Sequence, residues 1–202
     1  LDVIPRLQEV QKMSMLIRMA TVQDAAELLE IYRPYVKETS ITFETEVPTE
    51  SEFAERIAEI LSRFPYLVAE EDGRLLGYAY AHPFHQRAAY GWTVESSVYV
   101  RKDVRHGHIG TLLYEKLLSM LRAQGARNVC AVITVPNAPS MAFHKKLGFE
   151  IGGVLPDFGY KLRQWHGVSY LYRSLGGGAE APAPLKSVWE LPEALRMPDV
   201  FA

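Results

Sequence analysis

Hydrophobic and polar positions follow two different periods along the chain, and these periods predict its helices and strands. Hydrophobic residues three or four positions apart indicate the buried face of a helix, whereas short runs of β-branched and aromatic residues indicate strands. Helices are expected from Thr21 to near Pro34 and over 48–64, 109–124 and 137–147. Strands are expected over 16–20, 66–71, 75–81, 94–100, 128–135, 149–155 and 169–175.

Proline and glycine residues support several of these boundaries. The first helix should weaken near Pro34, because the residue before a proline is biased away from helical geometry. The pair Asp72-Gly73 predicts a tight hairpin between two strands, and Gly125 predicts the end of the helix over 109–124. The segment 39–45 is β-rich but polar, so it could be a short strand or an ordered loop.

The order of these elements predicts one mixed α/β sheet. The hairpins make neighbouring strands antiparallel, whereas the helix over 109–124 connects two strands that should be parallel. The last two strands should be joined across a loop that contains Lys161, Trp165 and His166.

The two ends of the chain differ from its middle. We expect an N-terminal extension over 1–15, a single domain over 16–175, and a linker with a tail over 176–202. The linker prediction depends on the run of glycine, alanine and proline that follows Leu175. Hydrophobic residues lie beyond it, including Trp189, and we expect a docked tail, which could lie on its own domain or on a neighbouring subunit.

Composition narrows the class of protein. The chain has 202 residues, of which 48% are hydrophobic and 23% are charged, as in a globular domain. Its net charge of −2 provides no overall basic field for nucleic acid or an anionic membrane, and no apolar run has the length of a membrane span. The single cysteine, Cys130, cannot form an internal disulfide and is expected to be a buried structural thiol. We therefore expect a soluble cytoplasmic protein that contacts neither nucleic acid nor membrane.

The stretch 93–113 organises the rest of the chain. It reads as a strand, a basic turn with Gly107 and Gly110, and the start of a helix. The first N–H groups of a helix lack internal partners, and the helix dipole favours an anion there. The stretch therefore predicts a phosphate-binding site, although a plain strand–helix junction remains an alternative from these residues alone.

Several separated motifs narrow this prediction. Arg105-x-x-His108-x-Gly110 resembles the pyrophosphate loop of the GNAT N-acetyltransferases, with His108 where that family usually has glycine. Three further motifs resemble the phosphinothricin acetyltransferase branch of that family, namely Tyr90-Gly-Trp-Thr-Val-Glu-Ser-Ser-Val-Tyr-Val, Pro136-Asn-Ala-Pro-Ser and His144-Lys-Lys-Leu-Gly-Phe. The resemblance covers about 17–175.

The resemblance implies the GNAT fold, acetyl-CoA as co-substrate and a homodimer. In that fold two central parallel strands splay apart, and the pantetheine arm pairs with backbone in the opening. No metal is implied, since the amine attacks the thioester directly. The residues that the resemblance assigns to acetyl-CoA are Val98, Tyr99, Val100, Arg105, His106, Gly107, His108, Ile109, Gly110, Thr111 and Asn137.

Two residues are candidates for catalysis. Glu95 matches the family's general base, which removes a proton from the amine, and desolvation would raise its pKa and suit it to that task. An ordinary strand carboxylate in an ion pair is the alternative. His144 could take a proton, orient Glu95 or line the site, or it could be a helix histidine that packs on Leu147.

Four residues are candidates for binding the acceptor, by resemblance. Arg87 and Tyr90 match positions that contact a small amino-acid-like acceptor, and an arginine can bind a carboxylate with two parallel hydrogen bonds. Phe43 matches an aromatic wall residue, and His85 stands where the family has lysine. The expected acceptor is phosphinothricin, methionine sulfoximine or methionine sulfone. A peptide N-terminus, or a CoA-binding regulatory module with little catalysis, are the alternatives.

Overall fold

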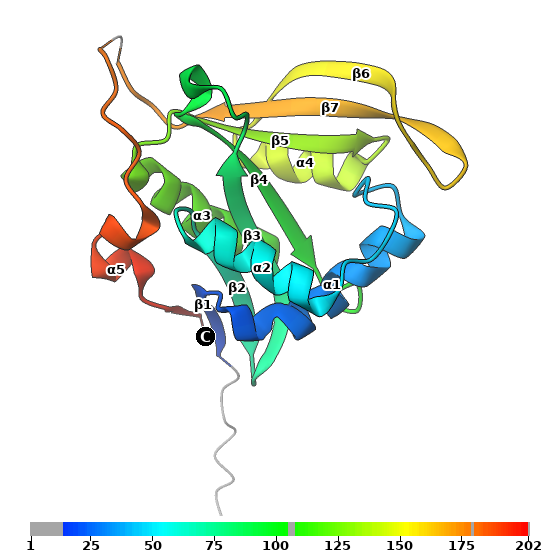
Figure 1. Cartoon of the computed structure of the whole chain (residues 1–202), viewed down its shortest axis with the longest axis horizontal. Helices are drawn as coiled ribbons and strands as arrows, with labels where there is room; N and C mark the ends of the chain where they lie inside the picture. The colour runs from blue at the N-terminus through cyan, green and yellow to red at the C-terminus, as the bar shows by residue number, and fades with distance from the viewer. Residues whose placement is uncertain (1–13, 105–107, 179, 202) are drawn as a thin grey trace, which may run out of the picture.

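The protein is built on one eight-stranded sheet, seen in the computed structural model in Figure 1. The structure describes residues 14–104, 108–178 and 180–201. The strands follow the order β6-β7-β5-β4-β3-β2-β1-β8 across the sheet. Their bounds are β1 Met15–Met19, β2 Tyr66–Glu71, β3 Arg74–Pro83, β4 Thr93–Val100, β5 Asn128–Val135, β6 Glu150–Lys161, β7 Gln164–Ser174 and β8 Asp199–Phe201.

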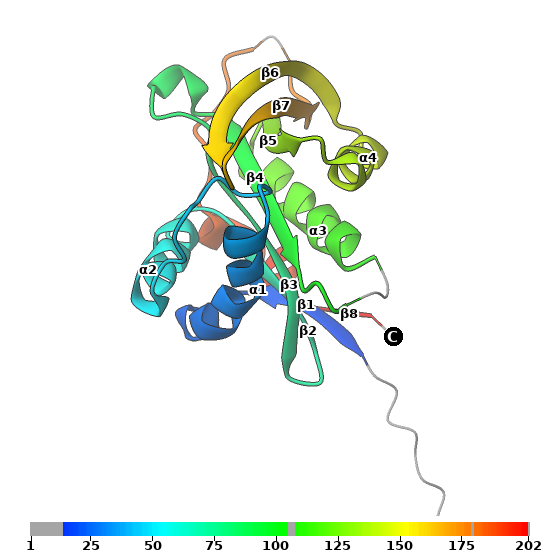
Figure 2. The ribbon, with the colours of Figure 1, turned by 90° about the vertical axis from the view of Figure 1, so that its right-hand side faces the viewer.

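Helices cover both faces of the sheet. The helices α1 (Ala25–Glu38) and α2 (Glu50–Leu61) lie on one face, and α3 (Ile109–Gln124) and α4 (Ala138–Lys146) lie on the other, as Figure 2 shows edge-on. A short helix, α5 (Glu193–Arg196), lies in the tail. None of the helices within the described residues combines the length and the apolar character needed to cross a membrane.

A separate hydrophobic core fills each side of the sheet. The α3 core is the larger one, and it buries the helical stripe Leu113, Leu117 and Leu121 completely. The other core packs the stripes of α1 and α2 on the opposite face of β2 and β3. The predicted boundaries of the strands over 66–71 and 128–135 and of the helix over 109–124 are confirmed residue for residue.

The parallel pair β4–β5 opens soon after it begins. Residue pairing covers only Thr93 with Asn128, Val94 with Val129 and Glu95 with Cys130, although both strands continue. Figure 1 shows the two strands diverging from this start. The predicted splay of the central parallel strands is thus confirmed, within the predicted mixed α/β sheet.

Two local predictions were wrong. Helix α1 continues through Pro34 to Glu38, because the hydroxyl of Tyr35 bonds the Val100 carbonyl at 2.5 Å and the buried Val36 packs in the core, so tertiary contacts offset the missing N–H. The predicted loop around Lys161 is instead a continuous hairpin, in which β6 and β7 pair as far as Lys161 with Gln164. Segment 39–45 proves to be a loop.

The described part of the tail lies on the domain. Val188 is completely buried in the α3 core, and β8 pairs antiparallel with β1, whose edge it covers. The indole N–H of Trp189 donates to the Leu61 carbonyl at 2.7 Å, and the ammonium of Lys116 lies 2.9 Å from the Asp199 carboxylate. The division of the chain after residues 15 and 175 stays a prediction.

Candidate active site

Strand β4 separates two different environments. Successive side chains on a strand point to opposite faces of the sheet. Val94, Ser96 and Val98 face α3, whereas Glu95 and Tyr99 face α1 and α2. A site built around this strand therefore has an α3 side and an α1/α2 side, with different chemistry on each.

The opening between β4 and β5 is a narrow cleft. It has a volume of about 60 Å³ and is lined by residues of both strands and of α4, including Ser96, Val98, Ile133 and Asn137. Because pairing with β5 ends at Glu95, the next residues of β4 have no neighbouring strand on that side. An extended chain that carries amide groups can pair there as an added strand, so the cleft fits the pantetheine arm of CoA. Val98, Tyr99 and Val100 lie in this part of β4 that is not paired with β5, and their contact with the cofactor stays a prediction.

The N-terminus of α3 begins beside this cleft. His108 occupies the N-cap position, and Ile109, Gly110 and Thr111 form the first turn, where helix N–H groups are available to an anion. Arg105, His106 and Gly107 lie outside the described residues. A Cβ on Gly110 would come 3.3 Å from the Phe143 ring, so the glycine also lets α3 and α4 approach closely.

Asn137 begins α4 as its N-cap. Its side-chain oxygen accepts a hydrogen bond from the Ser140 N–H at 3.2 Å, and the residue also lines the β4–β5 cleft. The capping role is therefore present, and a contact with the cofactor stays a prediction.

Polar groups on the α3 side of β4 form a buried chain of hydrogen bonds. The Tyr114 hydroxyl lies 3.1 Å from the Ser96 hydroxyl and 3.0 Å from His144 Nε2. The single proton of the Ser96 hydroxyl has two acceptors within reach, the Tyr114 oxygen and the Cys130 carbonyl at 3.2 Å. His144 Nδ1 lies 2.9 Å from the Ser140 carbonyl, which can only accept. Nδ1 therefore carries the proton, and a neutral Nε2 accepts from Tyr114.

His144 is 4% exposed and lines the β4–β5 cleft. Burial lowers the pKa of its imidazole, which favours the neutral form, although the Ser140 carbonyl opposes this shift. Because both ring nitrogens are engaged by Tyr114 and Ser140, the structure does not support the alternative in which His144 orients Glu95 directly.

On the α1/α2 side, Glu95 is half-buried on β4, near His82 of β3 and His85 of the loop between β3 and β4. Burial raises the pKa of its carboxyl group, while the nearby His82 and His85 lower it. Burial and the charge of Glu95 together raise the pKa of the neighbouring Cys130 thiol, so this thiol stays protonated and is a poor nucleophile. A carboxylate with a raised pKa is suited to accept a proton.

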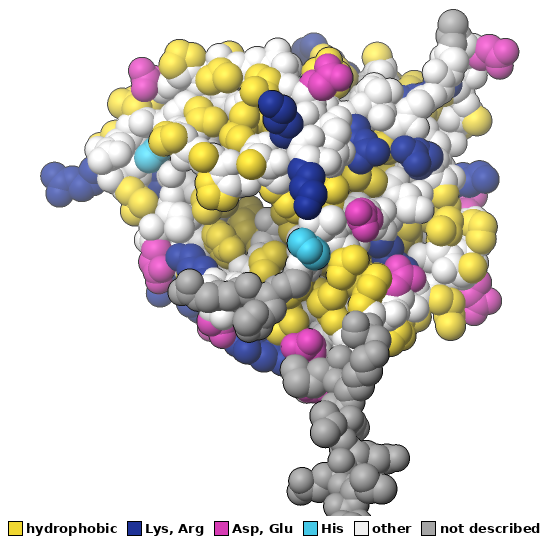
Figure 3. All heavy atoms as spheres, turned by 180° about the vertical axis from the view of Figure 1, so that it is seen from behind, with side chains coloured by type: hydrophobic (Ala, Val, Ile, Leu, Met, Phe, Trp, Pro, Cys, Tyr) yellow, Lys and Arg dark blue, Asp and Glu magenta, His cyan; other side chains and the backbone are white. Residues whose placement is uncertain are grey.

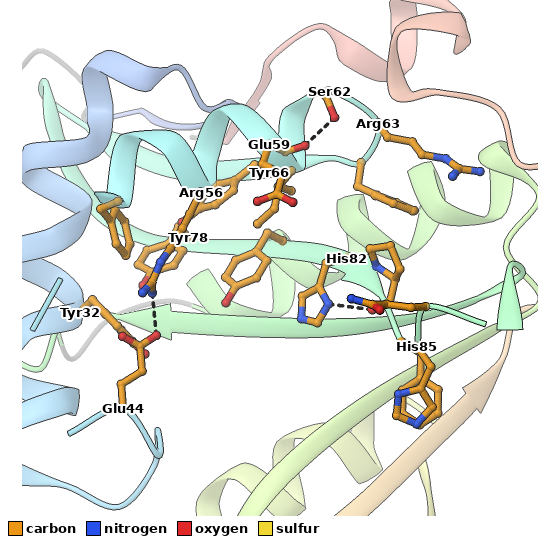
Figure 4. A pocket seen from close by; sticks show the side chains of 17 residues that line it. Tyr32, Glu44, Arg56, Glu59, Ser62, Arg63, Tyr66, Tyr78, His82 and His85 are labelled. Atoms are coloured by element: carbon orange, nitrogen blue, oxygen red, sulfur yellow. Dashed lines mark hydrogen bonds and ion pairs between the residues drawn. The ribbon is translucent and has the colours of Figure 1, made fainter. Parts of the chain in front are cut away.

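A pocket of about 630 Å³ lies on the α1/α2 side, between α2 and the strands β2 and β3. Its floor is a row of stacked rings from Tyr66, Tyr78 and Tyr80, which we call the tyrosine row. Figure 4 shows the Glu44–Arg56 ion pair at one end of this pocket and His82 and His85 at the other. His82 is paired with Glu95 across β3 and β4, so the pocket leads to the candidate base.

The structure brings three of the four predicted acceptor residues together. His85, Arg87 and Tyr90 line an adjoining depression of about 320 Å³, where the His85 ring lies 5.0 Å from the Tyr90 ring. Phe43 lies apart from them, because its ring packs against Gly159 of β6. Phe43 therefore packs loop 39–49, to which it belongs, against the β6–β7 hairpin. The Lys161 ammonium, which donates to the Thr42 carbonyl, joins the same two segments.

Sequence reasoning missed Tyr114 and the tyrosine row. Tyr114 reads as one more core position of an amphipathic helix, and only the fold brings it to Ser96 and His144. The alternation of Tyr78, Tyr80 and His82 along one strand was a usable signal, since three polar-tipped rings on one sheet face are unusual for a core.

Comparisons with known proteins agree with this geometry. The family model for the acetyltransferase (GNAT) domain matches residues 17–167. Phosphinothricin N-acetyltransferase of Streptomyces viridochromogenes is 40% identical over 172 residues, which cover 85% of this chain and 92% of that protein. The L-methionine sulfoximine/L-methionine sulfone acetyltransferase of Pseudomonas paraeruginosa is 37% identical over 172 residues, 84% of this chain and all of that protein.

Solved structures give the same assignment. A phosphinothricin acetyltransferase from Sinorhizobium meliloti in complex with AcCoA has a TM-score of 0.79 and 36% identity, and the match covers 83% of this chain and 92% of that one. A ribosomal-protein-alanine N-acetyltransferase from Brucella melitensis has a TM-score of 0.76 and 31% identity, over 78% of this chain and 98% of that one. With the splayed strands and the cleft that accepts an amide chain, these matches show that the chain belongs to the GNAT acetyltransferase family and is an acetyl-CoA-dependent N-acetyltransferase.

Proposed function

We propose that the protein acetylates the α-amine of a small amino acid analogue of the phosphinothricin, methionine sulfoximine or methionine sulfone type, with Glu95 as general base. The observation that carries this proposal is the position of Glu95, a half-buried carboxylate at the last paired residue of the splayed strands, beside His82, which lines the pocket. The names of the relatives at 40% and 37% identity support the acceptor class.

The residues on the α1/α2 side activate and hold the acceptor in this reaction. Acetyl-CoA supplies the acetyl group as a thioester. Glu95 takes a proton from the acceptor ammonium, because only the neutral amine is a nucleophile. The C–N bond then forms as the C–S bond breaks, and a second proton from the attacking nitrogen passes to the leaving thiolate. Arg87 pairs with the acceptor carboxylate, and Tyr90 and His85 pack beside it. Holding the amine and the thioester together lowers the activation barrier by about 7–11 kcal/mol in favourable cases.

On the other side of β4, the chain holds the cofactor. The free backbone of Val98 to Val100 pairs with the pantetheine arm, and the first turn of α3 binds the pyrophosphate. His144 stays neutral, lines the cleft and positions the Tyr114 hydroxyl beside it. The thiol product leaves through this cleft.

We also propose that the protein is a homodimer that pairs through the β6–β7 hairpin. β6 is an edge strand, and Ile151, Val154, Phe158, Tyr160 and Trp165 of the hairpin are each more than half exposed. Hydrophobic side chains are frequent in the upper part of Figure 3, where this hairpin lies. An exposed apolar edge is stabilised when a second copy covers it.

The test is thiol release from acetyl-CoA with phosphinothricin, methionine sulfoximine, methionine sulfone or a short peptide, each offered separately. Turnover with an amino acid analogue and not with the peptide supports the proposal. The peptide N-terminus is the second candidate acceptor, favoured by the similarity to the ribosomal-protein-alanine N-acetyltransferase and by the exposure of the loop around Arg87. Turnover with the peptide alone would replace the first candidate by the second.

A further inference from the structure

We infer that the pocket between α2 and the tyrosine row holds the side chain of the acceptor and selects an uncharged, hydrogen-bonding end, such as a sulfone or sulfoximine, over an anionic phosphinate. This inference rests on the proposed function and narrows its acceptor class. It concerns residues that the catalytic account leaves unused, chiefly Glu44, Arg56 and Tyr66.

The first observation is a pair of buried hydroxyl groups without protein partners. Tyr66 and Tyr78 are 2% and 1% exposed, and both line the pocket. Neither hydroxyl forms a hydrogen bond with a described residue. Neither hydroxyl oxygen is completely inaccessible, so a ligand can reach both. Figure 4 shows both side chains between α2 and the sheet. Burial raises the pKa of each phenol well above its ordinary value, so both remain O–H donors.

The second observation is the charge balance of the pocket. Arg56, the cation nearest the far end, lies 2.6 Å from the Glu44 carboxylate and is already neutralised. Glu59 and Arg63 add one charge of each sign. Arg63 lies toward the opposite end in Figure 4, with its guanidinium 5.6 Å from the Phe64 ring. The four lining charges therefore sum to zero, and Glu95 at the entrance adds a negative one.

The third observation fixes how an acceptor lies in the pocket. Its amine must reach Glu95, and its carboxylate meets Arg87 in the adjoining depression. His82 lines the pocket and is paired with Glu95, so the remaining substituent of the α-carbon points along the tyrosine row toward Glu44 and Arg56. The pocket volume of about 630 Å³ accommodates such a side chain.

The side chain of phosphinothricin ends in a phosphinate anion, whereas sulfone and sulfoximine ends are neutral. An anion that loses water requires an unpaired cation. At the end of the pocket where the side chain terminates, the cation is Arg56, and Glu44 already pairs with it. The other lining cation, Arg63, lies toward the opposite end. A neutral sulfonyl oxygen requires only hydrogen-bond donors, which Tyr66 and Tyr78 provide. Specificity here arises as much from the unfavourable term for the anion as from new contacts with the neutral group.

The test compares kcat/KM for methionine sulfone with kcat/KM for phosphinothricin in two opposed variants. Glu44→Gln frees the Arg56 charge and is expected to shift the ratio toward phosphinothricin by about ten-fold. Arg56→Met leaves Glu44 as an unpaired anion and is expected to shift the ratio about as far toward methionine sulfone. Glu55→Gln, an exposed glutamate of α2 outside the pocket lining, is the matched control and should leave the ratio unchanged.

A KM for acetyl-CoA that is unchanged in each variant shows that the cofactor-binding side of β4 is intact. Opposite shifts in the two variants, with an unchanged control, support the inference. A ratio that is the same in Glu44→Gln, Arg56→Met and wild type overturns it, even if both acceptors are acetylated. Absence of turnover with either acceptor in the wild-type protein overturns instead the proposed function, and this result is seen before any variant is made.

Discussion

Two sets of buried polar groups, one on each side of β4, differ in whether the protein itself bonds them. On the α3 side, the hydroxyls of Ser96 and Tyr114 and both nitrogens of His144 bond to one another or to backbone. On the α1/α2 side, the hydroxyls of Tyr66 and Tyr78 face a pocket, and no described residue bonds either of them. The side chains are similarly buried, so burial alone does not explain the difference.

This difference separates groups that maintain the fold from groups that await a ligand. A buried polar group that is bonded by the protein stabilises the native state, and its loss leaves a partner unsatisfied. A polar group that lines a pocket gains its partner only when a ligand binds. We therefore expect mutations on the α3 side to affect stability, and mutations on the α1/α2 side to affect catalysis and acceptor binding.

The largest expected effect is on catalysis, from Glu95→Gln. The amide keeps the size of the side chain but cannot accept a proton from the ammonium, so kcat should fall about 10²- to 10⁴-fold while the KM for acetyl-CoA stays within about two-fold. The wild-type kcat/KM should also fall toward acid pH, with an apparent pKa above the ordinary range of a glutamate, because burial raises the pKa of Glu95. Steady-state kinetics from pH 5 to 9 measure both, and a fall toward acid pH that persists in the variant would exclude Glu95 as its source.

The next effect is on stability, from Tyr114→Phe. This change removes one hydroxyl from the fully buried chain and leaves His144 Nε2 without its donor. The free energy of unfolding should fall by about 1–3 kcal/mol, the cost of an unsatisfied buried polar atom. Urea unfolding monitored by circular dichroism measures this, and an unchanged midpoint would show that the chain adds nothing to stability.

A pH dependence of stability should come from the same side. The folded-state pKa of His144 lies below its ordinary value of 6.5, so the unfolded chain binds the proton more tightly. Stability is therefore fully present above pH 6.5 and is lost as the pH falls through the lowered folded-state pKa. His144→Asn should flatten this loss in urea unfolding between pH 7.5 and 5. Because the raised pKa of Glu95 acts with the opposite sign, the comparison is best repeated in the Glu95→Gln background.

The smallest expected effect is the sharpest test of the comparison. Tyr66→Phe removes the hydroxyl of a residue that is nearly as deeply buried as Tyr114 but whose hydroxyl has no hydrogen-bond partner among the described residues. Unfolding free energy should change by no more than about 0.5 kcal/mol. The acceptor KM should rise several-fold, because the ligand loses a donor. If Tyr66→Phe destabilises the protein as much as Tyr114→Phe does, the proposed distinction between the two sides of β4 fails.

The sequence predicted much of the fold because its local signals agree with the final structure. Hydrophobic periodicity placed α3, β2 and β5 at their observed bounds, and Asp72-Gly73 gave the hairpin, where both residues have positive φ. Local signals failed where tertiary contacts outweigh them. Contacts of Tyr35 and Val36 stabilise α1 beyond Pro34, and β6 and β7 pair again from Gly159 with His166 to Lys161 with Gln164, where a loop was expected.

For the site, the sequence by itself determined the residue types that carry the chemistry and their order along the chain. Glu95 and the start of α3 belong to short contiguous motifs, and Arg87 lies just before one of them, so the sequence alone made each a candidate. Only the tertiary structure decided which side of β4 each side chain faces and which polar groups meet. Ser96, Tyr114 and His144 come from three distant segments, as do Glu44, Arg56 and Tyr66. Hydrogen bonds and charge pairing act over a few ångströms in space, and sequence spacing does not fix such distances until the chain has folded.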